Sequence, residues 1–242
     1  MKRAQTRGWI ALLVIGLPVA LTMAAPAVAW DVREDPPAED FRAFHRRFSS
    51  SAYAYPRHSA AALGLTGFEV YVEASYDEEF DDEPFAATVL DDDLTGGFLS
   101  VGRVGARKGL PGGIDLGLSY GRALGGDISL ISGEIQYAFF KGGPLTPALS
   151  LRVTGTRTTG SGNYDLDQYG AELLLSKGFT LLTPYIGVGA VYSEGRVGDL
   201  QEDDTEFVAY AGLTLNLLLP KITVEVEQGE VVQGAVRLGF GF

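Results

Sequence analysis

From Gly67 to the end of the chain, apolar and polar side chains alternate with a period of two residues. In the stretch from Phe68 to Tyr76, Phe, Val, Val, Ala and Tyr fall on one side, and Glu, Tyr, Glu and Ser fall on the other. Successive side chains of a β-strand point to opposite faces, so this pattern predicts strands with one apolar and one polar face. We expect about ten such strands joined by turns, with eight strands as the alternative.

The first 29 residues have the three parts of a secretory signal peptide. A basic start from Met1 to Arg7 leads into an apolar run from Trp9 to Met23, and Ala27-Val28-Ala29 fits the small-x-small cleavage pattern. The apolar run is shorter than the ~20 residues that a spanning helix needs. We therefore expect residues 1–29 to direct export and to be removed.

The exported chain is acidic and contains no cysteine. The formal charge of the whole sequence is -12, and loss of the signal peptide removes three basic and no acidic residues, which gives -12 - 3 = -15. Such a charge argues against nucleic acid as a partner. Without cysteine the fold cannot use disulfides, so it depends on strand pairing and packing.

Residues 30–66 do not follow the strand pattern. Phe41, Phe44 and Phe48 recur at three- and four-residue spacing, which predicts a short amphipathic helix from about Ala38 to Phe48. Isolated helices of this length are marginal, so a disordered leader is the alternative. We interpret residues 30–66 as a periplasmic leader or plug and residues 67–242 as the barrel, with coil over residues 49–54 and 58–66.

The connections between the expected strands alternate in length and charge. The longer, mostly polar or acidic connections cover residues 77–95, 124–127, 158–163, 194–206 and 229–233. The tight turns, each with a lysine, cover residues 108–113, 141–146, 177–179 and 219–221. This asymmetry is typical of barrels with extracellular loops and short periplasmic turns. The same register places outward aromatic residues near both ends of the strands, as expected at two membrane interfaces.

The last strand, Gly234 to Phe242, ends on an aromatic residue, and its outward set is Val236, Leu238, Phe240 and Phe242. With this terminal pattern, residues 67–242 resemble the small outer-membrane β-barrel proteins of Gram-negative bacteria. The resemblance implies an all-β, antiparallel, up-and-down transmembrane β-barrel in the cell outer membrane. It also implies contact with outer-membrane lipid and lipopolysaccharide, recognition of the C-terminal insertion signal by the barrel-assembly machinery, and a monomer.

The sequence offers no catalytic constellation on the expected strands or outer loops. His45 and His58 are the two histidines, and both precede the first strand, so the outer rim lacks the general base of known barrel hydrolases. We therefore expect a surface scaffold or narrow pore that is not an enzyme and needs no cofactor. A transporter of small apolar or cationic solutes and a soluble secreted lipocalin-like binding barrel are the alternatives.

An acidic stretch follows the first strand and is a weak candidate for binding Ca²⁺ or Mg²⁺ through oxygen ligands. Its candidate ligands are Asp81, Asp82, Asp91, Asp92 and Asp93. The spacing matches no EF-hand loop, since there is no glycine at the position of the sharp turn. A solvated loop is therefore the favoured interpretation, and we assign no metal site.

The inward faces of the strands carry a network of charged residues with more acids than bases. The predicted network comprises Glu69, Glu73, Arg103, Asp115, Glu134, Arg152, Glu172, Glu225, Glu227 and Arg237. Unpaired charges in a narrow barrel are costly, so we expect an added cation to offset the excess. The helix over residues 38–48 carries Arg42, Arg46 and Arg47, and we expect it to cap the periplasmic mouth near Glu69, Glu225 and Glu227.

Overall fold

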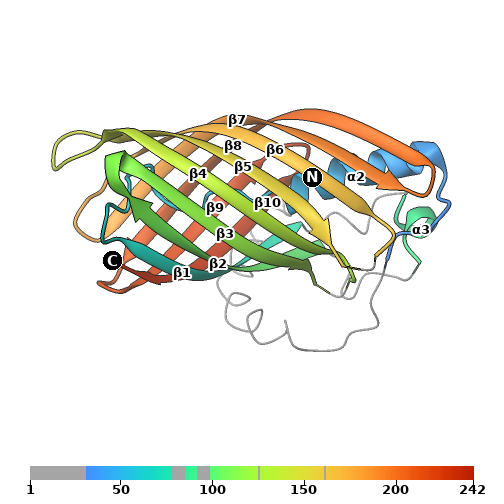
Figure 1. The fold of residues 1–242 in the computed structure, drawn as a ribbon, viewed down its shortest axis with the longest axis horizontal. Helices are drawn as coiled ribbons and strands as arrows, with labels where there is room; N and C mark the ends of the chain where they lie inside the picture. The colour runs from blue at the N-terminus through green and yellow to red at the C-terminus, as the bar shows by residue number, and fades with distance from the viewer. Residues whose placement is uncertain (1–30, 78–84, 92–98, 125, 161) are drawn as a thin grey trace, which may run out of the picture.

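The chain forms a closed antiparallel β-barrel in a computed structural model that describes residues 31–77, 85–91, 99–124, 126–160 and 162–242 (Figure 1). Each strand pairs with its neighbours in sequence, and β1 pairs with β10 to close the barrel. The strands are β1 (Phe68–Asp77), β2 (Leu99–Leu110), β3 (Ile114–Ala123), β4 (Ser129–Lys141), β5 (Ala148–Thr159), β6 (Asp165–Ser176), β7 (Leu182–Val197), β8 (Leu200–Asn216), β9 (Pro220–Gln228) and β10 (Val232–Gly241). The predicted fold class and the count of ten strands are confirmed, and the alternative of eight strands is wrong.

The strand register places the apolar face outside and the polar face inside. Along β6, for example, Tyr169 and Leu173 are exposed, whereas Gln168 and Glu172 are buried. A soluble barrel buries its apolar face, so this distribution contradicts the lipocalin-like alternative and is the one found in membrane-spanning barrels. The outward aromatic residues form two groups near the two ends of the barrel: Phe68, Tyr137, Phe139, Phe240 and Phe242 in one, and Tyr76, Tyr120, Tyr169, Tyr192 and Phe207 in the other.

The predicted acidic loop over residues 194–206 is wrong. The β7–β8 hairpin continues through this stretch, with Glu194 opposite Asp203 and Val197 opposite Leu200. Beyond the apolar band, outward positions carry charges such as Glu194 and Asp203, while Glu202 and Asp204 lie on the inner face of β8 and approach Arg42 and Arg46 of α2. Val197 is buried inside the end of the barrel. Charge is compatible with strand pairing where the outward side chains meet water and the inward ones meet arginines of α2, so the acidic run did not mark a loop.

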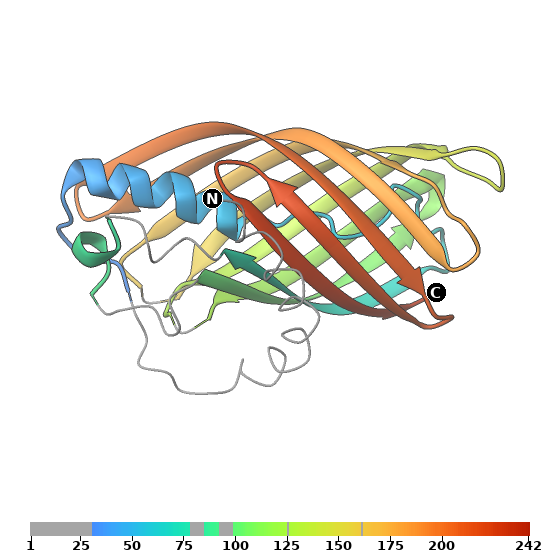
Figure 2. The same ribbon diagram turned by 180° about the vertical axis from the view of Figure 1, so that it is seen from behind.

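Two helices lie at the end of the barrel opposite the C-terminus (Figures 1 and 2). Helix α2 (Ala38–Ala52) confirms the predicted helix and extends it by four residues, so the expectation of coil from Ser49 is wrong in part. Helix α3 (Ala86–Val89) is a single short turn, and a 3-10 turn η1 (Pro111–Gly113) joins β2 to β3 at the other end. Among the described residues, no helix is long and apolar enough to cross a membrane.

The apolar face of α2 closes its end of the barrel with a cluster of buried side chains, here called the cap cluster. Phe44 stacks on Phe48 with ring centroids 5.3 Å apart, and Tyr164 meets Phe44 edge-on at 5.2 Å. Such aromatic contacts add to the stability gained from burial. The strands and α3 complete the cap cluster with Phe85, Val89, Leu90, Leu99, Val101, Ala123, Ile128, Leu130, Leu166 and Val197.

The chain after α2 runs through the inside of the barrel to the opposite end, where β1 begins; we call residues 53–66 the lumen segment. Its contacts with the wall follow its length: Ala54 O accepts from Arg152, Ala60 N donates to Ser176, and Leu65 O accepts from Lys108. The first lies in mid-barrel, and the last lies near the turn that contains η1. The lumen is therefore filled by the protein's own chain.

Candidate functional site in the barrel lumen

All ten residues of the predicted charge network point into the barrel and are buried or nearly so. The wall strands that carry them are β1 to β6, β9 and β10. Burial of charge is costly unless each group finds a partner and hydrogen bonds. The arrangement of partners around the lumen segment therefore decides whether the lumen is open or closed.

Arg57 of the lumen segment lies at the centre of the network, and its side chain is fully buried. Its Nη1 donates to Glu73 Oε1 at 2.6 Å, while Nε and Nη2 donate to the two carboxylate oxygens of Glu227 at 2.8 and 3.0 Å. Glu225 Oε1 lies 3.9 Å from Arg57 Nε. A two-pronged contact of this kind between guanidinium and carboxylate is among the stronger hydrogen-bonded pairs in proteins.

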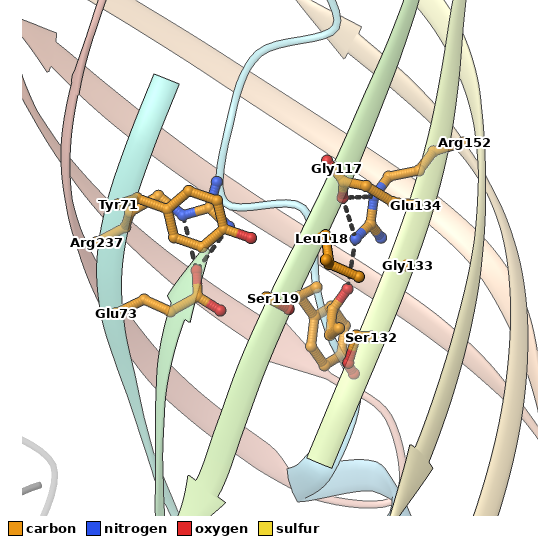
Figure 3. Close-up of a pocket in the computed structure, with 12 residues that line it drawn as sticks. Tyr71, Glu73, Gly117, Leu118, Ser119, Ser132, Gly133, Glu134, Arg152 and Arg237 are labelled. Atoms are coloured by element: carbon orange, nitrogen blue, oxygen red, sulfur yellow. Dashed lines mark hydrogen bonds and ion pairs between the residues drawn. The ribbon is translucent and has the colours of Figure 1, made fainter. Parts of the chain in front are cut away.

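Glu73 also binds an arginine of the wall. Arg237 donates to Glu73 Oε2 through Nε at 2.7 Å, and its Nη2 lies 2.6 Å from the same oxygen (Figure 3). The guanidinium carbon of Arg237 lies 3.7 Å from the centre of the Tyr71 ring, a cation–π contact. Glu73 thus joins β1 to β10 on one side and to the lumen segment on the other.

A second group of pairs lies on the neighbouring part of the wall (Figure 3). Arg152 Nε donates to Glu134 at 2.7 Å, its Nη1 donates to Glu172 at 2.7 Å, and its Nη2 donates to the carbonyl of Ala54 at 2.7 Å. Arg107 donates to the other oxygen of Glu134 at 2.6 Å. The wall therefore forms hydrogen bonds with the backbone of the lumen segment as well as with its Arg57 side chain.

The expectation that α2 caps the mouth near Glu69, Glu225 and Glu227 is wrong. The helix lies at the other end of the barrel, where its arginines pair with acids of the loops and strand ends: Arg42 with Glu202, Arg46 with Glu230, and Arg47 with Asp77. The apolar face of α2 finds its partners in the cap cluster at this end. The cation that reaches Glu225 and Glu227 is Arg57, which lies between the two stretches that were expected to be coil.

Sequence reasoning missed two arginines of the site. Arg107 lies four residues after Arg103 on β2, so its inward position followed from the two-residue period and could have been predicted. Arg57 lies in a stretch without strand or helix periodicity, and no local signal distinguished it. The charge excess was the one indication that a cation was missing from the lumen.

The part of the lumen formed by β5 to β8 is mainly apolar. Tyr53 and Tyr55 of the lumen segment pack there against Tyr185, Tyr210 and the apolar side chains Ala148, Leu174, Val191 and Val208. Gly212 and Gly187 leave space for the two wall tyrosines, because a Cβ at these glycines would lie 2.3 Å from Tyr185 and 2.1 Å from Tyr210. Arg57 therefore contacts the charged side of the lumen, and Tyr53 and Tyr55 contact the apolar side formed by β5 to β8.

Two small cavities are found among the described residues that line the lumen. One cavity of about 10 Å³ lies near Tyr55 and Glu134, and another of about 50 Å³ lies near Arg57 and Lys221. A buried water needs roughly 10–15 Å³ by this measure, so the larger cavity holds about three to five waters. These volumes are too small for solutes of the size that pores pass.

His45 of α2 is buried against the inner wall at the cap end. Its Nδ1 lies 2.6 Å from the Tyr164 hydroxyl, and its Nε2 lies 3.2 Å from the Ser193 hydroxyl. Burial lowers the pKa of His45, and Asp204, Glu202 and Asp203 act against that shift. His58 lies in the lumen segment, so neither histidine lies at an exposed rim.

The remaining predicted residues are placed as follows. Val236 and Leu238 are partly exposed and Phe240 and Phe242 are exposed, all on the outer face of the last strand. Of the weak metal candidates, Asp91 lies beside α3 and accepts a hydrogen bond from the Asp31 amide at 2.6 Å. Asp81, Asp82, Asp92 and Asp93, like residues 1–29, lie outside the described residues. No cluster of three or more metal-binding side chains occurs among the residues that are described.

No protein-family model and no curated protein matches the sequence. Among solved structures, the chain is similar to the COG4313 outer membrane channel from Pseudomonas putida F1, with a TM-score of 0.46 and 11% identity over 78% of this chain and 100% of the other. It is also similar to the KdgM porin (0.39, 10%, 72% and 99%) and to the N-terminal β-barrel domain of Pseudomonas aeruginosa OprF (0.32, 16%, 74% and 99%). Because each TM-score is below 0.5, these neighbours do not indicate what this chain does.

Proposed function

We propose that this chain is an outer-membrane β-barrel that its own lumen segment keeps closed, so that it acts as a surface scaffold and not as an open pore. The observation that supports this is the seating of Arg57 among Glu73, Glu225 and Glu227 in the middle of the barrel. The two described cavities near Arg57 have volumes of only about 10 and 50 Å³, which supports a closed lumen.

The outer-membrane assignment rests on the outer surface of the barrel. Apolar side chains cover it, and exposed aromatic residues such as Tyr169 and Phe240 lie towards its two ends. Such surfaces suit a bilayer, with aromatic rings at the lipid–water interfaces. Outer-membrane lipid and lipopolysaccharide are the proposed partners of this surface, the C-terminal strand is proposed to bind the barrel-assembly machinery, and the barrel is proposed to be a monomer without catalytic activity or cofactor.

The test is single-channel conductance of the refolded protein in planar bilayers. The full exported chain is expected to show no steady conductance. A variant that carries a protease site between Leu65 and Thr66, two exposed residues at the mouth, can be folded intact and then cut. Extraction of the cut lumen segment with urea is expected to produce steady openings, since the emptied lumen is lined by charged residues on the side opposite the apolar cluster of β5 to β8.

Two controls accompany the measurement. The heat-modifiable shift on a gel reports whether the barrel stays folded after cutting. A variant with the same protease site in the exposed β4–β5 turn at Leu145 controls for cutting itself, because that turn lies outside the lumen. Steady conductance of the uncut chain, equal to that of the extracted barrel, would contradict the proposal.

A further inference from the structure

We propose that Glu73, Glu225 and Glu227 form a binding site for small organic cations of the guanidinium class, and that Arg57 occupies this site as an internal ligand. The inference rests on the proposed function, in which the lumen segment is a plug that is separable from the wall. It adds a ligand class to the lumen.

The three carboxylates belong to the wall and not to the plug. Glu73 lies on β1, whereas Glu225 and Glu227 lie on β9, and β10 runs between these two strands. Strand pairing holds all three in place through the registers of β1 with β10 and of β10 with β9. The backbone positions of the three acids are therefore set by the wall and not by Arg57.

Without Arg57 the site has an excess of negative charge. Arg237 and Arg103 both approach Glu73, at 2.6 and 3.9 Å. Within the described part of the chain, no cation other than Arg57 lies within 4.0 Å of Glu225 or Glu227. Two adjacent buried carboxylates without a cation are unfavourable, so a cation that binds in the place of Arg57 removes part of this cost.

The site also offers an acceptor that Arg57 does not use. Glu225 Oε1 is buried and has no hydrogen-bond partner among the described residues, although it lies 3.9 Å from Arg57 Nε. The other oxygen of Glu225 accepts from the Tyr185 hydroxyl, which fixes the direction of the carboxylate. The Arg57 side chain is attached to the backbone of the lumen segment. A free cation has no such attachment, so it can move towards this oxygen and bind all three acids.

The geometry favours a planar guanidinium over a compact ammonium ion. Arg57 uses three N–H groups in a fixed fork, two of them on Glu227 and one on Glu73. An ammonium ion is a strongly hydrated point charge and cannot match the paired oxygens of Glu227 in the same way. Methylguanidinium reproduces the donor set of the arginine head group and is the probe of choice.

The experiment is chemical rescue of an Arg57→Ala variant of the full exported chain in detergent micelles. Methylguanidinium at millimolar concentration is expected to raise the melting temperature of this variant in a saturable way, because it binds the folded state. Wild type, whose site is filled, is expected to show no rise, and it also reports any denaturing effect of the probe. Tetramethylammonium and sodium at the same ionic strength are expected to rescue much less.

Further variants keep the inference testable. Arg157→Ala removes an arginine from an exposed pair on the outer face and should show no rescue. Addition of Glu227→Gln to Arg57→Ala should abolish the rescue, because the paired acceptor is lost. If Arg57→Ala does not refold alone, its refolding yield with and without methylguanidinium becomes the readout, and Arg57→Gln serves as a milder variant.

The inference is overturned if neither Arg57 variant responds to methylguanidinium more than wild type does in melting temperature or refolding yield. It is also overturned if the Arg157→Ala control responds equally. Neither result depends on conductance. If the full chain shows no conductance but chemical rescue fails, the binding site is contradicted and the proposed function is not. If the full chain conducts steadily, the proposed function is contradicted whatever the rescue experiment shows.

Discussion

Replacement of Arg152 by methionine should be among the most destabilising single changes in the barrel wall. The Arg152 guanidinium is buried and donates to Glu134, to Glu172 and to the carbonyl of Ala54, each at 2.7 Å. Methionine retains much of the apolar volume of the side chain and removes all three contacts. The experiment therefore isolates the polar role of the residue from its packing.

The expected cost follows from which partners keep a cation. Glu134 retains Arg107 at 2.6 Å, but Glu172 loses the one arginine that pairs with it among the described residues. Removal of one partner from a buried ion pair costs about 3–5 kcal/mol, because the other charge remains buried. We expect a loss of about this size in the free energy of unfolding, with the freed carbonyl of Ala54 contributing part of it.

The measurement is urea unfolding of the refolded barrel in lipid vesicles, followed by circular dichroism and by the heat-modifiable gel shift. The matched control is Arg157→Met on the same strand, because Arg157 faces outwards and pairs with Asp167 at 2.6 Å in an exposed position. Exposed pairs contribute little to stability, so this variant should unfold close to wild type. Addition of Glu172→Gln to Arg152→Met should recover most of the loss by removing the unpaired charge.

Two results would refute this reasoning. Equal destabilisation by Arg152→Met and Arg157→Met would show that burial of the pair does not determine its contribution. A double variant as unstable as Arg152→Met would show that the unpaired carboxylate of Glu172 is not the source of the cost. In either case the lumen network would be more hydrated than its buried side chains indicate.

Three further predictions concern assembly, topology and pH. Phe242→Asp should lower the amount of barrel in outer-membrane fractions while Phe242→Tyr should not, because an exposed interfacial ring is lost only in the first; equal amounts would count against the insertion signal. Asp199→Cys and Glu34→Cys should react with an impermeant maleimide on intact cells, and Leu145→Cys should not, since both helices and the β7–β8 turn lie at the end opposite the C-terminus. Labelling of Leu145→Cys alone would show that the barrel has the opposite orientation in the membrane. Burial lowers the pKa of His45 in the folded state, so below about pH 6.5 the unfolded state binds a proton that the folded state does not, and the free energy of unfolding should fall as the pH drops through and below that value. His45→Gln should flatten this dependence in melting measured against pH. An unchanged slope would exclude His45 as its source.

The barrel wall could be predicted from the sequence because its signal is local. In a strand the direction of each side chain depends only on whether its position is odd or even, so Tyr169 and Glu172 could be assigned to opposite faces without knowledge of their neighbours. The same rule assigned the ten charged residues of the predicted network to the lumen. It also placed Phe240 and Phe242 on the outer face.

The sequence pattern did not predict the structure correctly where a solvated loop and a paired strand have the same amino-acid composition. The acidic stretch from Glu194 to Glu206 reads as a solvated loop, yet it continues a hairpin beyond the apolar band. Charges that face water or the arginines of α2 are acceptable whether the backbone is paired or not, so composition does not distinguish the two. The pairing of Val197 with Leu200, inside a closed end of the barrel, decided it.

What the sequence determined by itself is the wall: the strands, their two faces and the excess of acid inside. What only the tertiary structure decided is how that excess is met. Arg57 contacts Glu227, which is 170 positions away in the sequence. The lumen segment has no period, and its residues contact several different strands, such as β5 at Ala54 and β6 at Ala60. The end at which α2 docks also depends on a surface that β2, β3, β4, β6 and β7 form together, which no single strand shows by itself.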